Sequence, residues 1–289
     1  MRKRPSRVDT LASDLSSAAR RVTPRSFSKA LIQKRLCLQE ALTTISEGVR
    51  PAENRIHTLH KEVRAFRVEV RMLRRLTPDV QEGEVRSVGK WLGRLSNALG
   101  ALRDLDVINR LLTNRLQGSS KETQGRIKDW VNEIRSERAR LRADLQRLAT
   151  ASLRHIEQAA LGGVSELPAK AFRHRLLKLV SQADLEVIEA LLKARKRPTV
   201  KSLHRLRIAI RRARLVRKAA THGSAGFPKP WIRIQNDLGL THDQAILVDW
   251  AREKDMPRRD PPLFRHFYKR LGYLQRKSSN RIHDDALWP

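Results

Sequence analysis

The chain has 289 residues, and its 61 Lys and Arg against 30 Asp and Glu give a formal net charge of +31. This charge exceeds what solubility requires and indicates an anionic partner. Most of the basic residues are Arg, whose planar guanidinium binds phosphate oxygens through paired hydrogen bonds. Phosphate therefore suits the chain better than a diffuse acidic surface. The alternative is a basic face that is merely solvated. The placement of the charges along the chain must distinguish the two.

The single cysteine, Cys37, excludes an intramolecular disulfide framework and a thiolate-rich zinc site. It lies in an apolar helical pattern, so we expect it to pack in the core. The apolar runs are too short for a membrane span, and no hydrophobic region follows residues 1–7, as a secretory signal would require. These features favour a cytoplasmic location without membrane contact. The first thirty residues, rich in Arg and Ser, also resemble an organelle transit peptide.

Apolar residues recur at intervals of three and four along the chain, which predicts an all-α fold. Helix breakers divide the chain at Pro24, Pro51, Pro78, Gly118, Gly162-Gly163, Pro168, Pro198, Gly223 to Pro230, and Pro257 to Pro262. Helices of about 20 to 30 residues with short loops favour antiparallel bundles. We expect a basic flexible tail over residues 1–24, one bundle over 25–160 and a second over 161–289. Residues 122–160 should form a long charged helix, or a helix pair, that leads from one bundle to the next.

Two blocks of sequence recur in the same order in both halves. The first block places His57 over His204, Arg64 over Arg211, Arg67 over Arg214 and Arg71 over Lys218. The second block places Arg94, Asn97, Leu99, Gly100 and Asp104 over Arg233, Asn236, Leu238, Gly239 and Asp243. Such a repeat predicts a duplicated unit whose copies are related by a pseudo-two-fold axis.

Basic residues of the first block share one helical face. At about 100° per residue, the face of the first helix contains His57, His60, Lys61, Arg64, Arg67, Arg71 and Arg74. The equivalent face of the second helix contains His204, Arg207, Arg211, Arg214 and Lys218. Apolar residues flank both faces, and we expect Glu62 and Glu69 to project away from the bases.

Like charges at this spacing repel by a few tenths of a kcal/mol per pair. An anion that neutralises them would relieve the repulsion, and a phosphate chain could follow such a face turn by turn. The alternative is that acids elsewhere in the bundle form salt bridges with the face.

The histidines at the head of each face allow several interpretations. His57 and His60 have a spacing that metal ligands use, but the second half has Arg207 at the position of His60. We therefore predict no metal site and no cofactor. A further hydrogen-bond donor for an anion, strengthened by protonation, is one role. A capping or packing histidine is the other.

The block from Leu99 to Val107 suggests a turn. Gly100 would allow a tight turn or a close helix approach, and Asp104 would cap the next helix or hold an Arg. We assign Gly100, Asp104, Gly239 and Asp243 a structural role at such turns. These acids are too few for a two-metal phosphohydrolase, and no nucleotide-binding or hydrolase signature is present, so no catalytic residue is predicted.

These motifs resemble those of the CHAD family, the conserved histidine α-helical domain. The chain carries His204-x-x-Arg207-x-x-x-Arg211-x-x-Arg214 and Leu99-Gly100-x-x-Arg103-Asp104-x-Asp106-Val107 in full. It departs from the family pattern at His60 and at His242, where Arg is expected. The resemblance covers roughly residues 25–285. It implies two four-helix bundles around a central basic groove that binds inorganic polyphosphate without catalysis, in a stand-alone protein that can collect on polyphosphate granules.

The predicted polyphosphate site comprises both basic faces, with Arg94 and Arg233 as secondary positions. Nonspecific binding of DNA or RNA is the main rival, because large basic surfaces attract nucleic acids. Aromatic residues make up only 4% of the chain, and the faces lack stacking platforms for single strands. An accessory role beside a polyphosphate-metabolising enzyme is a further alternative. The sequence indicates no oligomeric state.

Overall fold

The computed structural model describes residues 17–49, 52–77, 82–117, 119–158, 161 and 163–284. Within these ranges the chain is helical and contains no strand. The elements are α2 (Pro24–Ser46), α3 (Glu53–Leu76), α4 (Glu82–Leu116), α5 (Lys121–Glu157), η1 (Gly163–Glu166), α6 (Ala169–Lys196), α7 (Val200–Ala220), α8 (Lys229–Glu253), α9 (Met256–Arg259) and α10 (Pro261–His283). The prediction of an all-α fold is confirmed.

Local sequence signals explain where several helices begin. Thr23 and Thr199 cap α2 and α7 in the same way, since each side chain accepts a hydrogen bond from a backbone N–H three residues on and the serine there reciprocates. Pro24 occupies the first turn of α2, where its missing N–H has no cost. Asp260, which is 2% exposed, caps α10 and accepts from the N–H of Leu263.

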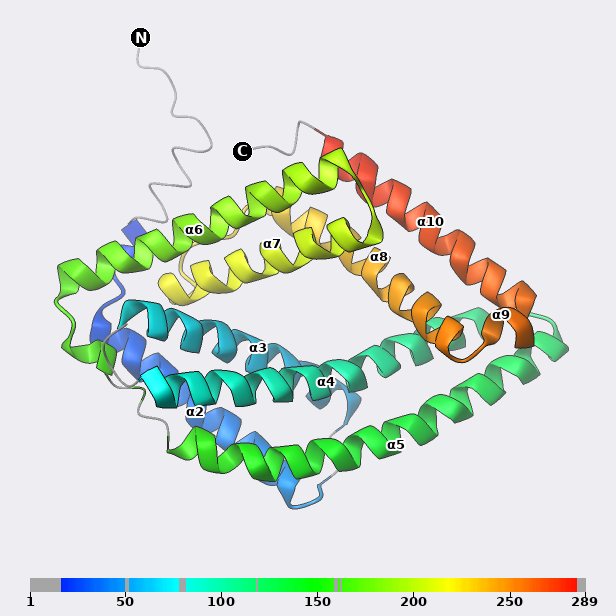
Figure 1. Ribbon diagram of the computed structural model, residues 1–289, viewed down its shortest axis with the longest axis horizontal. Coiled ribbons are helices and arrows are strands. Elements are labelled where there is room, and N and C mark those ends of the chain that lie inside the picture. Colours follow the sequence, from blue (N-terminus) through cyan, green and yellow to red (C-terminus); the bar gives the residue numbers. More distant parts are fainter. Residues whose placement is uncertain are drawn as a thin grey trace, which may run out of the picture.

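The helices occur in the same order in both halves. In the first half α3 packs on α4 and α4 on α5, and in the second half α7 packs on α8 and α8 on α10. The two sets meet where α3 contacts α7 and α4 contacts α8, in the middle of the molecule (Figure 1). This arrangement is the one expected of a duplicated unit whose copies face each other.

Two hydrophobic cores hold the helices together, and neither belongs to one half of the sequence alone. The larger core joins α2, α3, the first part of α4 and the last part of α5 to α6, α7 and the start of α8. The smaller core joins the other ends of α4 and α5 to α8, α9 and α10. Because α4 and α5 are long, with 35 and 37 residues, each reaches both cores. The division into bundles at residue 160 therefore does not describe how the cores are shared.

Further expectations differ from the structure at single positions. Cys37 is exposed on α2 and is not part of the core. The packed part of the chain begins before the predicted boundary at residue 24, because Ala19 and Val22 are already buried. The rest of the predicted tail, residues 1–16, lies outside the described residues. Nowhere in the described ranges is a helix both long enough and apolar enough to cross a bilayer.

We expect Leu99→Ala to lower the free energy of unfolding by about 2–5 kcal/mol, because Leu99 is 0% exposed and its loss leaves a cavity in the larger core. Leu240→Ala is the matched control. Its side chain is 52% exposed, so the cost should stay within about 0.5 kcal/mol. Urea unfolding followed by circular dichroism measures both variants, and equal midpoints would contradict the assigned core.

Candidate functional site

Four arginines from three helices gather where the two halves meet. Arg64 comes from α3, Arg103 from α4, and Arg207 and Arg211 from α7. Their charges act on one another: Arg207 and Arg103 lower the pKa of Arg64, and Arg64 lowers the pKa of Arg211. We call these four residues the central arginine cluster. It joins the basic face of α3 to that of α7.

The cluster is only partly exposed to water, so its charged guanidinium groups lose part of their hydration. Burial first, and neighbouring guanidinium groups second, lower the pKa of Arg64, Arg207 and Arg211 to about 10 each. Within the described part of the chain, the buried Nε atom of Arg64 has no hydrogen-bond partner, nor has that of Arg67. Buried donors of this kind usually have an acceptor, which makes the cluster a candidate site for an anion.

Two carboxylates neutralise part of the cluster. Arg103 donates from Nη2 to Oδ1 of Asp243 at 2.7 Å and from Nη1 to Oδ1 of Asp104 at 3.0 Å, and thereby links α4 to α8 across the junction of the halves. Burial lowers the pKa of Arg103, but both carboxylates outweigh it and the pKa is raised overall. Arg110 adds a further contact to Asp243 at 3.5 Å. Both carboxylates are thus engaged by Arg103, while Arg64, Arg207 and Arg211 keep an excess of positive charge.

Histidines line the cluster and are neutral at pH 7. His60 is 7% exposed, and burial followed by the charges of Arg64 and Arg211 lowers its pKa to about 3. Burial and the charge of Arg207 lower the pKa of His242 to about 3 as well. The Nδ1 atoms of His204 and His242 lie 3.0 Å apart, a hydrogen bond that requires one ring to donate and the other to accept. Without a bound anion His60 and His242 are therefore neutral, and a role as protonated donors would require the anion to be present.

Gly100 and Gly239 are not in turns. They lie inside the continuous helices α4 and α8, as do Asp104 and Asp243, so the turn prediction was wrong. A Cβ atom on Gly100 would lie 3.5 Å from Cε1 of His60, and one on Gly239 would lie 3.9 Å from Nε of Arg207. Both distances are those of ordinary van der Waals contact, so a Cβ would fit at either position and neither helix contact requires glycine there. Asp104 and Asp243 hold Arg103 and do not cap a helix.

The remaining predicted residues lie outside the central arginine cluster. Arg67 extends over α4, where a Cβ on Gly93 would lie 3.3 Å from its Nη2 atom. Burial, followed by Arg67 and Arg212, lowers the pKa of Arg71, which lines a cavity beside α6. The guanidinium of Arg94 lies 4.5 Å from the ring centroid of Trp91. His57 is half-buried near Lys61, and the exposed residues are Lys61, Arg71, Arg74, Arg94, Arg214, Lys218 and Arg233.

Glu69 is buried and lies against a neighbouring helix. It is 5% exposed and forms an ion pair with Lys34 of α2, and it lies near Lys218. Glu69 therefore pairs with a base of α2, and no described contact joins it to the basic face of α3. Residues after Arg211 on α7 are accordingly less suited to an anion than the central cluster is.

Sequence analysis did not select Arg103, His242 or Arg110 as site residues. Arg103 and His242 occupy equivalent positions of the two copies, each one residue before an aspartate. Their place in the repeated block was the signal that could have identified them. Arg110 lies two turns further along α4, outside that block, and only its contact with Asp243 brings it to the site.

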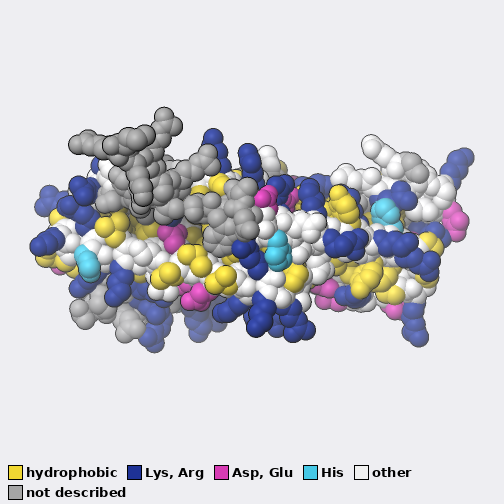
Figure 2. All heavy atoms as spheres, turned by 90° about the horizontal axis from the view of Figure 1, so that it is seen from above, with side chains coloured by type: hydrophobic (Ala, Val, Ile, Leu, Met, Phe, Trp, Pro, Cys, Tyr) yellow, Lys and Arg dark blue, Asp and Glu magenta, His cyan; other side chains and the backbone are white. Residues whose placement is uncertain are grey.

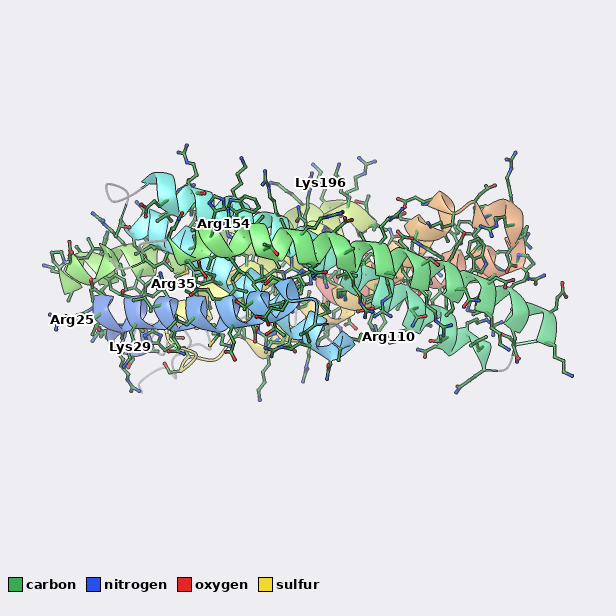
Figure 3. The ribbon with its side chains drawn as sticks, turned by 90° about the horizontal axis from the view of Figure 1, so that it is seen from below. Arg25, Lys29, Arg35, Arg110, Arg154 and Lys196 are labelled. Atoms are coloured by element: carbon green, nitrogen blue, oxygen red, sulfur yellow. The ribbon has the colours of Figure 1, made fainter. Side chains whose placement is uncertain are left out.

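Exposed basic side chains also occur far from the cluster. Figure 2 shows Lys and Arg along the whole length of one edge of the molecule, with few acids among them. Figure 3 labels examples on outer helices: Arg25 and Lys29 of α2, Arg154 of α5 and Lys196 of α6. Net charge alone therefore does not locate the site. The burial and convergence of the central arginines do.

Over the ranges that the structure describes, no group of three or more His, Cys, Asp and Glu is arranged to hold a metal ion. The chemistry that the cluster supports is the binding of several anionic oxygens by guanidinium groups, with neutral imidazoles as additional hydrogen-bond partners.

Comparison with known proteins identifies the family. The family model described as CHAD domain matches residues 13–252. The crystal structure of the CHAD domain from the plant Ricinus communis superposes with a TM-score of 0.63 at 17% sequence identity, covering 91% of this chain and 92% of that one. No curated protein matches significantly. The family model spans most of the chain and the structural neighbour has the same fold, so the protein belongs to the CHAD domain family.

Proposed function

We propose that the protein binds inorganic polyphosphate at the central arginine cluster and along the adjoining basic faces of α3 and α7, without catalysing a reaction. The observation that carries this proposal is the excess of buried positive charge at Arg64, Arg207 and Arg211. A polyanion would replace the water that these groups lose on burial and would relieve their mutual repulsion. The resemblance of the motifs to the CHAD pattern supports the same ligand.

A chain of phosphates fits this arrangement better than a single phosphate. From His57 to Arg74 the α3 face extends about 25 Å at 1.5 Å per residue, and the α7 face adds cations on the other side of the cluster. A nucleic acid duplex is less suitable, because a rigid rod of stacked bases cannot place its phosphates against side chains that lie between packed helices. Binding of polyphosphate would bring the protein to cytoplasmic polyphosphate granules.

The first test is the double variant Arg64→Glu with Arg211→Glu. It replaces two cluster cations by anions, so we expect the affinity for long-chain polyphosphate to fall at least about 100-fold, an effect of about 3 kcal/mol. The control is Arg55→Glu with Arg205→Glu, which makes the same charge change on the same helices at exposed positions away from the basic faces. Fluorescence anisotropy measures the affinity, and circular dichroism verifies that each variant is folded. Equal losses of affinity in both double variants would show that binding depends on overall charge and not on the central arginine cluster.

The dependence of binding on salt gives a second measure. Each ion pair between protein and polyanion releases counterions, so the plot of log affinity against log salt should be steep. By analogy with nucleic acids, the double variant should reduce its slope by about 0.7–0.9 for each of the two lost contacts. Competition by duplex DNA and RNA at equal phosphate concentration completes the test. If both displace polyphosphate as well as unlabelled polyphosphate does, the protein is a general binder of polyanions.

The protonation of His60 provides a third test. Burial first, and positive neighbours second, hold its pKa at about 3 in the free protein. A bound polyanion favours the protonated ring, so the pKa should rise in the complex. Since the complex then binds more protons than the free protein, affinity should increase as pH falls through the raised pKa. Titration of the imidazole by NMR, with His60→Asn to assign the signal, measures the shift. An unchanged pKa in the complex would place the polyphosphate away from His60.

A further inference from the structure

The basic face of α7 continues into a pocket of the second half. The pocket lies between the start of α7, the middle of α8 and α10, helices that pack together at one side of the molecule (Figure 1). Its volume is about 590 Å³. Lys201 and His204 line it from α7, and His242 lines it from α8, so its inner wall is the histidine pair that borders the central arginine cluster.

The outer part of this pocket has a different chemistry from the cluster. Ile246 and Leu271 provide apolar surface, and the ring of Tyr268, which is 52% exposed, forms one side. The guanidinium of Arg252 lies 5.6 Å from the centroid of that ring. Asp249 is also at the outer part, where its carboxylate would repel phosphate but accept hydrogen bonds from amino or hydroxyl groups. The pocket therefore changes from cationic to aromatic and apolar over its length.

Comparison of the two halves shows how the residues at the pocket differ from their counterparts in the first half, where Arg142 and Gln146 line a smaller pocket of about 280 Å³. The offset that relates Asp104 to Asp243 places Ala245 over Asp106, whose carboxylate forms an ion pair with Arg138 at 2.7 Å. The buried positions Leu145, Ser152 and Ile156 of α5 match Leu271, Ser278 and Ile282 of α10. That match places Tyr268 over Arg142 and Gly272 over Gln146. An ion pair and long polar side chains thus stand in the first half where the second half has Ala245, Gly272 and an aromatic ring.

From these features we propose that the pocket accepts the base and ribose of a nucleoside polyphosphate whose phosphates lie on Lys201, His204 and the central arginine cluster. The base stacks on Tyr268 beside Arg252, since an aromatic ring and a guanidinium are the two planar surfaces that bases use. Asp249 accepts hydrogen bonds from the ribose hydroxyls or the base amino group. The inference rests on the proposed function, because the phosphate end of the ligand occupies part of the polyphosphate site.

The test compares two ligands that carry the same number of phosphates, adenosine 5′-tetraphosphate and inorganic tetrapolyphosphate, by calorimetry on the full chain. The nucleoside ligand should bind about tenfold more tightly, at the lower end of what stacking one base contributes. Tyr268→Ala should remove this preference and leave the affinity for tetrapolyphosphate unchanged, and Tyr268→Phe should retain it. Tyr273→Ala is the matched control, because Tyr273 is equally exposed on α10, at 50%, but does not line the pocket.

A second variant fills the pocket without removing the aromatic ring. Gly272→Gln introduces the residue of the first half, and the added Cβ would contact only Nη1 of Arg276, at 3.6 Å, so the helix should fold normally. It should abolish the preference for the nucleoside ligand. Equal affinities of the two ligands for the unaltered protein would overturn the pocket assignment and leave the polyphosphate proposal intact. If neither ligand binds, both proposals fail.

Discussion

The repulsion among guanidinium groups that are partly removed from water is the constraint on which the rest of the structure depends. Arg64, Arg207 and Arg211 lose hydration and face one another, which is unfavourable in a folded protein without a compensating charge. The apolar sides of α3 and α7 oppose this cost: Phe66, Val63 and Ile210 are at most 1% exposed. Packing energy from the core therefore holds the cations together before any anion arrives.

Such pre-organisation has a direct consequence for binding. A site whose cations are already converged does not pay to order flexible side chains when the ligand binds. Arg103 contributes to this order, because its hydrogen bonds to Asp104 and Asp243 fix it between the halves. The two carboxylates thus position one cation without neutralising the others.

The two copies of the repeat have diverged at the site. His60 and Arg207 occupy equivalent positions, as do Arg103 and His242, so each copy has one imidazole where the other has a guanidinium. Gly100 lies beside His60 in one copy, and Gly239 lies beside Arg207 in the other. At these positions each copy thus contributes one imidazole and one guanidinium to the junction, but on different helices of the repeat. That asymmetry gives the second half its paired histidines, His204 and His242.

The sequence alone determined the helices, their repeated order and the separation of basic from apolar residues on α3 and α7. These properties depend on the 3.6-residue period and on capping signals, which act within a few residues. Only the tertiary structure decided which side chains meet. Arg103 and Asp243 are 140 residues apart, and Lys34 and Glu69 are 35 apart, on different helices. The burial of Glu69, the exposure of Cys37 and the helical setting of Gly100 follow from how helices pack against each other. Helix packing depends on contacts between distant segments, and no local pattern contains that information.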